Sequence, residues 1–121
     1  MPESDRQFVV QRFREAVASP VLDLFEAALL ISQLIDPTED VGPAGELAES
    51  LALRVLRLRE EGKSSEGALR QVLFGEEGFT GDGDSYDDPE NSSVSRVLAR
   101  RRGMPITLSI IVMEVGRRAG M

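Results

Sequence analysis

The chain has 121 residues, of which 41% are hydrophobic and 29% are charged, and its formal net charge is −7. This length supports one hydrophobic core and this apolar content excludes a disordered chain, so a single globular domain over residues 1–121 is expected. The acidic balance excludes nucleic acid as the main partner, because phosphate binding needs a positive surplus on at least one face.

The sequence contains no cysteine and no histidine. These absences exclude disulfides, thiolate metal sites, a thiol nucleophile and the usual transition-metal ligands. We therefore expect no cofactor, and only a metal with oxygen ligands, such as calcium, would suit this composition. The N-terminal segment has neither basic nor apolar character, and no apolar run is long enough for a membrane span, so a cytoplasmic protein without membrane contact is expected.

Apolar spacing predicts two helices within the first 35 residues. The first covers about residues 5–18, after Ser4 and Gln7, which have the spacing of a capping box. Ser19 and Pro20 end this helix and open the second, because proline is tolerated at a first helical position. The second helix runs to about Ile35. Apolar residues cover most of its circumference, which predicts a core helix.

Residues 36–43 contain two prolines, a glycine and acidic side chains, the composition of a turn within the domain. An amphipathic helix is predicted from Ala44 to about Glu60, because apolar residues recur there every three or four positions. A shorter helix is predicted over residues 64–74, with Gly75 as its C-cap.

The segment 75–91 is predicted to be a long loop. Residues 76–91 include three glycines and seven acidic residues, with Phe79 and Tyr86 as the large apolar anchors. Loops of this length in compact domains are often functional.

Two further helices are predicted, over residues 92–102 and 105–119. Asn91 or Ser92 would cap the first, and three arginines would occupy its last turn before Gly103. Pro105 would open the second helix and Gly120 would end it. Its high apolar content predicts that it is the most buried helix of the chain.

Two chemical interpretations compete with structural ones. An acidic cluster resembles a calcium loop, but it departs from the EF-hand pattern at three positions, so a solvated loop with a turn at Asp88-Pro89 is favoured. Thr107 or Ser109 could replace a thiol nucleophile, but there is no histidine to act as the base. We instead expect Thr107 to cap or bond within its own helix, and Ser109 with Gly116 to allow close helix packing. The acidic cluster comprises Asp82, Asp84, Asp87, Asp88 and Glu90.

Charged side chains also predict specific ion pairs. The arginines 100–102 could bind phosphate or an acidic partner, but complementing the helix dipole is the favoured role. Arg101 or Arg102 is predicted to reach Asp87 or Asp88, which would tie the acidic loop to the neighbouring helix. Glu114 is predicted to pair with Arg118 in the favourable i, i+4 order, on the same face as Thr107.

Three segments follow one another in a distinctive order: 73–79 (LFGEEGF), 86–92 (YDDPENS) and 97–109 (VLARRRGMPITLS). With the continuation over residues 114–121, they resemble the SirB-type branch of the transglutaminase-like family across residues 68–121. The residues that carry this resemblance, with mainly structural roles expected, are Phe79, Tyr86, Asp88, Pro89, Asn91, Ser92, Arg101, Arg102, Gly103, Pro105, Thr107, Ser109 and Glu114.

The resemblance implies a mostly α-helical bundle of about five or six helices. This bundle would be the N-terminal part of an α+β transglutaminase-like domain whose sheet is absent here. In thiol-using members of the superfamily the nucleophile lies at the start of the core helix, a place that corresponds here to the neighbourhood of Pro105. The SirB-type pattern lacks the thiol.

The implied function is a non-catalytic scaffold or protein-interaction module with an unknown protein partner and the loop 75–91 as its binding surface. The alternative is part of a hydrolase or acyl-transfer enzyme whose remaining site residues lie beyond Met121. We expect the chain to be a fragment of a longer protein. Its last helix would then expose an apolar face, which would allow self-association.

Overall fold

The computed structural model describes residues 3–19, 23–83 and 87–121. The described residues form six α-helices and one pair of two-residue strands, which confirms the predicted mostly helical bundle. A π-helical segment extends α4, and a short 3-10 helix precedes α5. The elements are α1 (Glu3–Ala18), α2 (Leu24–Ile35), α3 (Gly42–Glu60), α4 (Ser65–Leu69), η1 (Arg70–Glu76), β1 (Thr80–Gly81), η2 (Pro89–Ser92), α5 (Val94–Arg100), β2 (Arg102–Gly103) and α6 (Pro105–Arg118).

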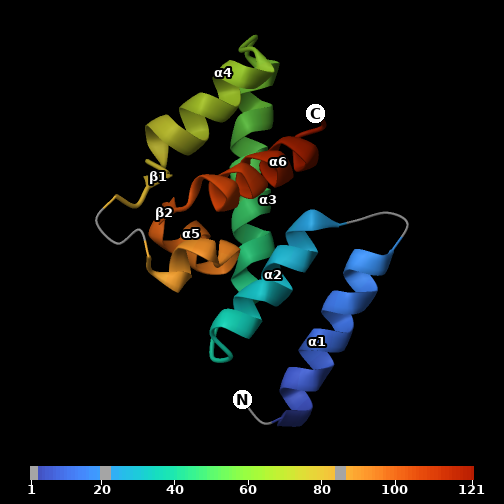
Figure 1. Cartoon of the computed structure of the whole chain (residues 1–121). Coiled ribbons are helices and arrows are strands. Elements are labelled where there is room, and N and C mark those ends of the chain that lie inside the picture. Colours follow the sequence, from blue (N-terminus) through green and yellow to red (C-terminus); the bar gives the residue numbers. More distant parts are fainter. Residues whose placement is uncertain (1–2, 20–22, 84–86) are drawn as a thin grey trace.

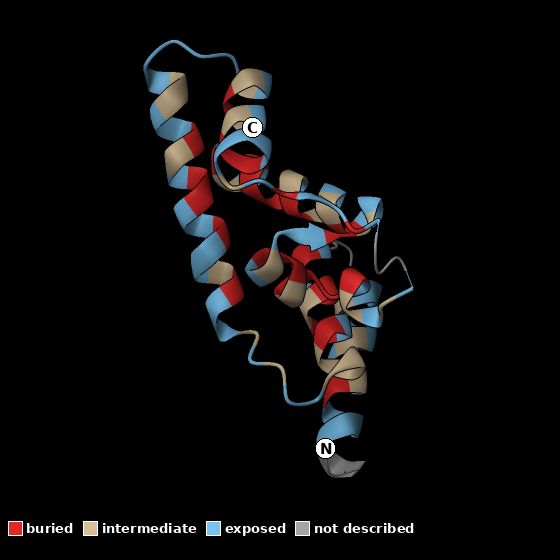
Figure 2. Ribbon diagram, turned by 90° about the vertical axis from the view of Figure 1, so that its left-hand side faces the viewer, coloured by how far each residue is buried: buried red, intermediate tan, exposed pale blue. Residues whose placement is uncertain are grey.

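The long helix α3 lies along one side of the bundle and α6 crosses it, while α5 packs against α2, α3 and α6, and α1 lies at the edge beside α2 (Figures 1 and 2). Buried residues gather on the faces that the packed helices turn toward one another (Figure 2). The core is one contiguous cluster of apolar side chains, which includes Phe25, Val55, Val72, Val97, Ile111 and Val115.

The helix α2 begins later than the sequence indicated. Its first residue is Leu24, because the side chain of Asp23 accepts a hydrogen bond from the Glu26 backbone N–H at 3.0 Å and so caps the helix. The predicted helix start at Pro20 is therefore wrong, and Pro20 itself lies outside the described residues. The prediction of a core helix is confirmed, since Phe25 and Ala28 both belong to the core cluster.

The prediction of one α-helix over residues 64–74 with Gly75 as its C-cap is also wrong. Ser64 caps α4, close to the predicted start, but the backbone widens into a π-helix at Arg70 and continues to Glu76. The glycine with a left-handed backbone after this segment is Gly78, with φ of 71°, and not Gly75. The extra turn brings Glu76 and Glu77 to Arg54, at 2.5 and 2.8 Å.

The helix α5 is shorter than the predicted helix 92–102. Ser93, and not Asn91 or Ser92, caps it by accepting a hydrogen bond from the Arg96 N–H at 3.3 Å. The helix ends at Arg101, whose φ of 65° is left-handed, so Arg102 and Gly103 leave the helix and form β2. Thr80 pairs with Arg102, and Gly81 pairs with Gly103, in parallel.

The helix α6 begins at Pro105 as predicted, and the left-handed Gly120, with φ of 85°, follows its end. The expectation that α6 is the most buried helix is wrong. Its side chains Ile106 and Met113 are 65% and 61% exposed. One apolar side of α6 is therefore uncovered.

Gly103 is required by packing. A Cβ atom at this position would lie 2.5 and 2.8 Å from the two γ-methyl carbons of Val97. We predict that Gly103→Ala lowers the free energy of unfolding by about 1–3 kcal/mol, because the added methyl group overpacks a filled site. Urea denaturation would measure the change. Gly83→Ala is the control, because nothing lies within 4 Å of a Cβ there. Equal stability of both variants would contradict the packing role.

Candidate functional site

The start of α6 is fixed by one backbone carbonyl. The Asn91 oxygen accepts hydrogen bonds from the Met104 N–H at 3.1 Å and from the Thr107 hydroxyl at 2.8 Å. Asn91 and Thr107 are both buried, and Pro105 lies between them at the first, exposed position of α6. The first turn of α6 is thereby attached to η2, which immediately precedes α5.

Both hydroxyl groups near this helix start are bonded to backbone carbonyls. Thr107 does not bond within its own helix, which corrects the prediction, because its hydroxyl reaches Asn91 instead. Ser109 makes the intrahelical bond and donates to the Pro105 oxygen at 2.9 Å. Ser109 is exposed, so only Gly116, which lies near Leu69, supports the predicted close packing. Neither hydroxyl is hydrogen-bonded to a side chain that could act as its base.

Arg100 holds the acidic segment before α5. Its guanidinium lies 3.2 Å from the buried Asp82 carboxylate, 3.3 Å from Glu90 and 3.8 Å from Asp88. The predicted pairs of Arg101 or Arg102 with Asp87 or Asp88 are wrong. The left-handed turn at Arg101 ends α5, and the guanidinium that faces the acidic segment belongs to the preceding residue.

The carboxylates that resembled a calcium loop therefore surround a guanidinium. Asp82, Asp88 and Glu90 all face Arg100, Asp87 is exposed, and Asp84 lies outside the described residues. Within the residues that the structure describes, no group of three or more metal-ligating side chains is arranged around a common position.

Glu77 connects the π-helical segment to α3 and to the end of α5. Its carboxylate accepts hydrogen bonds from Arg54 at 2.8 Å and from Arg101 at 3.0 Å. The hydrogen bond from Arg54, and to a smaller extent the one from Arg101, holds the pKa of Glu77 below its ordinary value. Sequence reasoning missed this pair because Arg54 and Glu77 lie 23 positions apart. Arg102 is exposed and makes no ion pair with any described residue.

Glu114 is a buried carboxylate on α6, 6% exposed. Burial alone would raise the pKa of Glu114, but hydrogen bonds from Arg117 and Arg118 outweigh it and hold the pKa below the ordinary value. The predicted i, i+4 pair is confirmed, with the Arg118 Nε 2.6 Å from the Glu114 carboxylate. Arg118 also donates to the Gly45 oxygen at 3.2 Å and lies 5.7 Å from the centre of the Phe25 ring.

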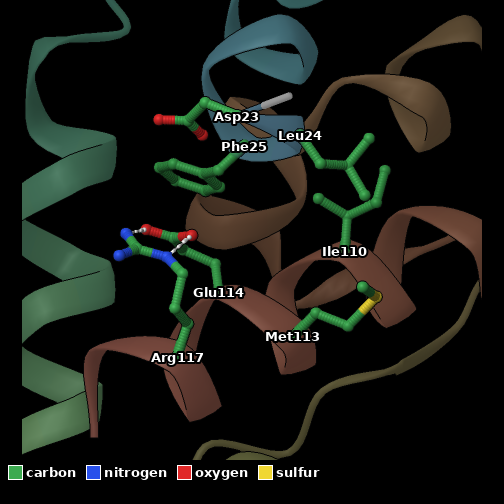
Figure 3. A pocket seen from close by; sticks show the side chains of 7 residues that line it. All are labelled: Asp23, Leu24, Phe25, Ile110, Met113, Glu114 and Arg117. Atoms are coloured by element: carbon green, nitrogen blue, oxygen red, sulfur yellow. Dashed lines mark hydrogen bonds and ion pairs between the residues drawn. The ribbon is translucent and has the colours of Figure 1, made fainter. Parts of the chain in front are cut away.

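A pocket of about 350 Å³ opens beside Glu114, between the start of α2 and α6. Figure 3 shows its polar residues, Asp23, Glu114 and Arg117, together with Phe25 on one side, and Leu24, Ile110 and Met113 on the other. Arg117 is oriented by two hydrogen bonds to Glu114, at 3.0 and 2.6 Å. The apolar wall continues the uncovered side of α6.

The remaining signature residues have structural roles. Phe79 is buried in the core, as predicted for a loop anchor. Asp88 caps η2 by accepting a hydrogen bond from the Glu90 N–H at 2.9 Å, and Pro89 is its first residue, which confirms the predicted turn. Ser92 donates to the Met104 sulfur. Tyr86 lies outside the described residues. The structure thus brings part of the signature together around the start of α6, namely Asn91, Ser92, Gly103, Pro105 and Thr107.

The lowered pKa of Glu77 predicts a pH-dependent contribution to stability. A carboxyl group with a depressed pKa in the folded state stabilises above its unfolded pKa of about 4.3, and this contribution disappears as the pH falls through the folded pKa. We predict that Glu77→Gln lowers the free energy of unfolding by about 1–2 kcal/mol near neutral pH. The difference from the unsubstituted chain should shrink below about pH 4.

Urea denaturation across this pH range would measure both effects. Glu60→Gln is the matched control, because Glu60 is exposed and makes no ion pair with a described residue. If the difference in the free energy of unfolding between Glu77→Gln and the unsubstituted chain stayed constant with pH, the charge of the Glu77 carboxylate would not be the source of the stabilisation.

Comparison with known proteins places this arrangement in a family. A family model described as "Transglutaminase-like superfamily" matches residues 44–121. A UPF0162 protein of Vibrio cholerae is 30% identical over 103 residues, which cover 82% of this chain and 38% of the relative. A UPF0162 protein of Xylella fastidiosa is 36% identical over 109 residues, which cover 87% of this chain and 38% of the relative.

The chain spans 38% of the length of these two relatives. No solved structure matches it significantly. None of the helices in the described residues is long and apolar enough to cross a membrane. The family match covers more than half of the chain, from the first turn of α3 to the end of α6. The chain therefore belongs to the transglutaminase-like superfamily, and its helices are consistent with the N-terminal part of such a domain.

Proposed function

We propose that this chain is a non-catalytic, cytoplasmic protein-interaction module of the SirB-type branch, and that it forms part of a longer scaffold protein. The observation that carries this proposal is the start of α6. In thiol-using members this place holds the nucleophile, whereas here it holds Pro105 and two hydroxyls whose protons are donated to backbone carbonyls. The sequence contains neither cysteine nor histidine, so both members of a thiolate–imidazole pair are missing from this chain.

Two surfaces compete as the interaction surface. Among the described acidic residues of the loop 75–91, Asp82, Asp88 and Glu90 pair with Arg100, and Glu77 pairs with Arg101. The alternative is the α6 face, formed by the exposed Ile106 and Met113 of α6 and Leu24 of α2, with the partly buried Ile110 of α6 between them. Its α6 members are spaced by four and three residues, so they form one stripe along the helix.

The α6 face is the better candidate. Contiguous apolar side chains exposed on a folded domain mark protein contacts more often than paired charges do. Because the chain spans 38% of the relatives it matches, we propose that further chain of the parent protein covers this face. In the isolated chain, a second copy would cover it instead.

The first test addresses catalysis. We predict that the chain neither releases ammonia from a glutamine-containing peptide nor joins an amine to it, because no side chain is poised as a nucleophile with its base. A thiol-dependent transglutaminase on the same peptide is the positive control. Any turnover that is lost in Thr107→Ala or Ser109→Ala would contradict the proposal.

The same assay on a longer parent protein addresses the rival function, a hydrolase or acyl-transfer enzyme with site residues outside this segment. That rival requires activity in the parent protein, with Thr107→Ala and Ser109→Ala identifying any role of the two hydroxyls. An inactive parent protein would favour the scaffold.

The second test addresses the α6 face. We predict that the isolated chain associates with itself as its concentration rises, and that Ile106→Glu with Met113→Glu weakens this association at least tenfold. Charges on this stripe would have to be desolvated in the contact. Sedimentation equilibrium would measure the constant. Leu53→Glu is the matched control, because Leu53 is 54% exposed on α3. A chain that remains monomeric at all concentrations would contradict self-association.

A further inference from the structure

The helix α2 is apolar on two opposite sides, and both are buried. At about 100° per residue, positions 25 and 28 face one side and positions 27 and 30 face the other. Phe25 and Ala28 belong to the contiguous core cluster. Ala27 and Leu30 are each 5% exposed but lie outside that cluster. A separate element must therefore cover this outer side of α2.

That element is α1. It lies alongside α2 in both views, and no other described helix packs extensively against it (Figures 1 and 2). Val9 is buried on α1, and Arg12 pairs with Glu26 of α2 at 2.8 Å, with both side chains about half exposed. Such an exposed ion pair contributes little to stability. The apolar contact of one helix face is thus the main attachment of α1.

The rest of the fold does not need α1 in order to pack. The core cluster is assembled from α2 to α6 and contains no residue of α1. Units with few buried contacts open at lower free energy than the core. The covalent connection between α1 and α2 consists of residues 19–23.

We propose that α1 is an exchangeable arm. It leaves the outer side of α2 while the core remains folded, and α1 of a second copy binds in its place. The exchanged contact uses the same residues as the contact within one chain, so the docking surface already fits its occupant. Exchange of an identical element between copies is a recognised route to symmetric dimers.

The absence of cysteine in the chain permits a direct test. One preparation carries Arg12→Cys and a second, of different mass, carries Glu26→Cys. The two are mixed at high concentration and then treated with a short bifunctional maleimide. Neither chain can crosslink within itself, so an Arg12→Cys chain joined to a Glu26→Cys chain reports α1 of one copy on α2 of the other.

We expect this heterodimer at least fivefold above the background given by Arg12→Cys mixed with Glu60→Cys, whose cysteine lies on α3. Yield at the background level at every concentration would overturn the proposal. Circular dichroism checks that each variant is folded, and both replaced side chains are partly exposed.

A second experiment distinguishes exchange of α1 from association through the α6 face. Inserting a Gly-Ser segment between Ser19 and Pro20 should lower the heterodimer yield, because a longer connection lets α1 reach its own α2 more easily. Introducing Ile106→Glu and Met113→Glu into both preparations should leave the yield unchanged. Loss of the heterodimer in that pair would show that the α6 face produces it and would overturn the exchange.

Discussion

The Arg118 side chain anchors the C-terminal end of α6. Its guanidinium bonds to the buried Glu114 carboxylate, to the Gly45 backbone oxygen and to Glu49, and it lies over the Phe25 ring. One side chain thus joins α6 to both α3 and α2. A buried carboxylate is tolerated only when its charge and lone pairs are satisfied, and removing its partner costs about 3–5 kcal/mol. Glu114 meets this requirement with two partners, because Arg117 also bonds to its carboxylate, at 3.0 and 2.6 Å.

The opposite end of α6 is held by backbone contacts. The Asn91 oxygen bonds to the first turn of α6, and Gly103 lets the chain approach Val97 closely enough for this to happen. Arg101 turns the chain out of α5 in a left-handed conformation that few non-glycine residues adopt. Its side chain then bonds to Glu77. The strained backbone and the ion pair occur at the same residue, so glycine could relieve the strain only by losing the pair.

Local patterns predicted the elements that depend on local chemistry. Pro105 begins α6 as its sequence position indicated, and the spacing of Glu114 and Arg118 predicted their pair. Two errors were local, at the caps of α2 and α5, and others occurred where residues distant in sequence determine the structure. The π-helical turn after α4 brings two glutamates to Arg54, on a helix that precedes it in the chain. The role of Gly103 depends on the methyl groups of Val97, and no sequence pattern reports such a distance.

The apolar circumference of α2 shows how a correct prediction can still be incomplete. An all-round apolar helix is expected to be buried, and α2 is. The pattern does not state that two independent partners bury it, the core on one side and α1 on the other. The α6 face presents the converse case, since Ile106 and Met113 remain exposed and only Ile110 between them packs against the core. Two opposite sides of α2 are buried within this chain, whereas Ile106 and Met113 of α6 remain exposed.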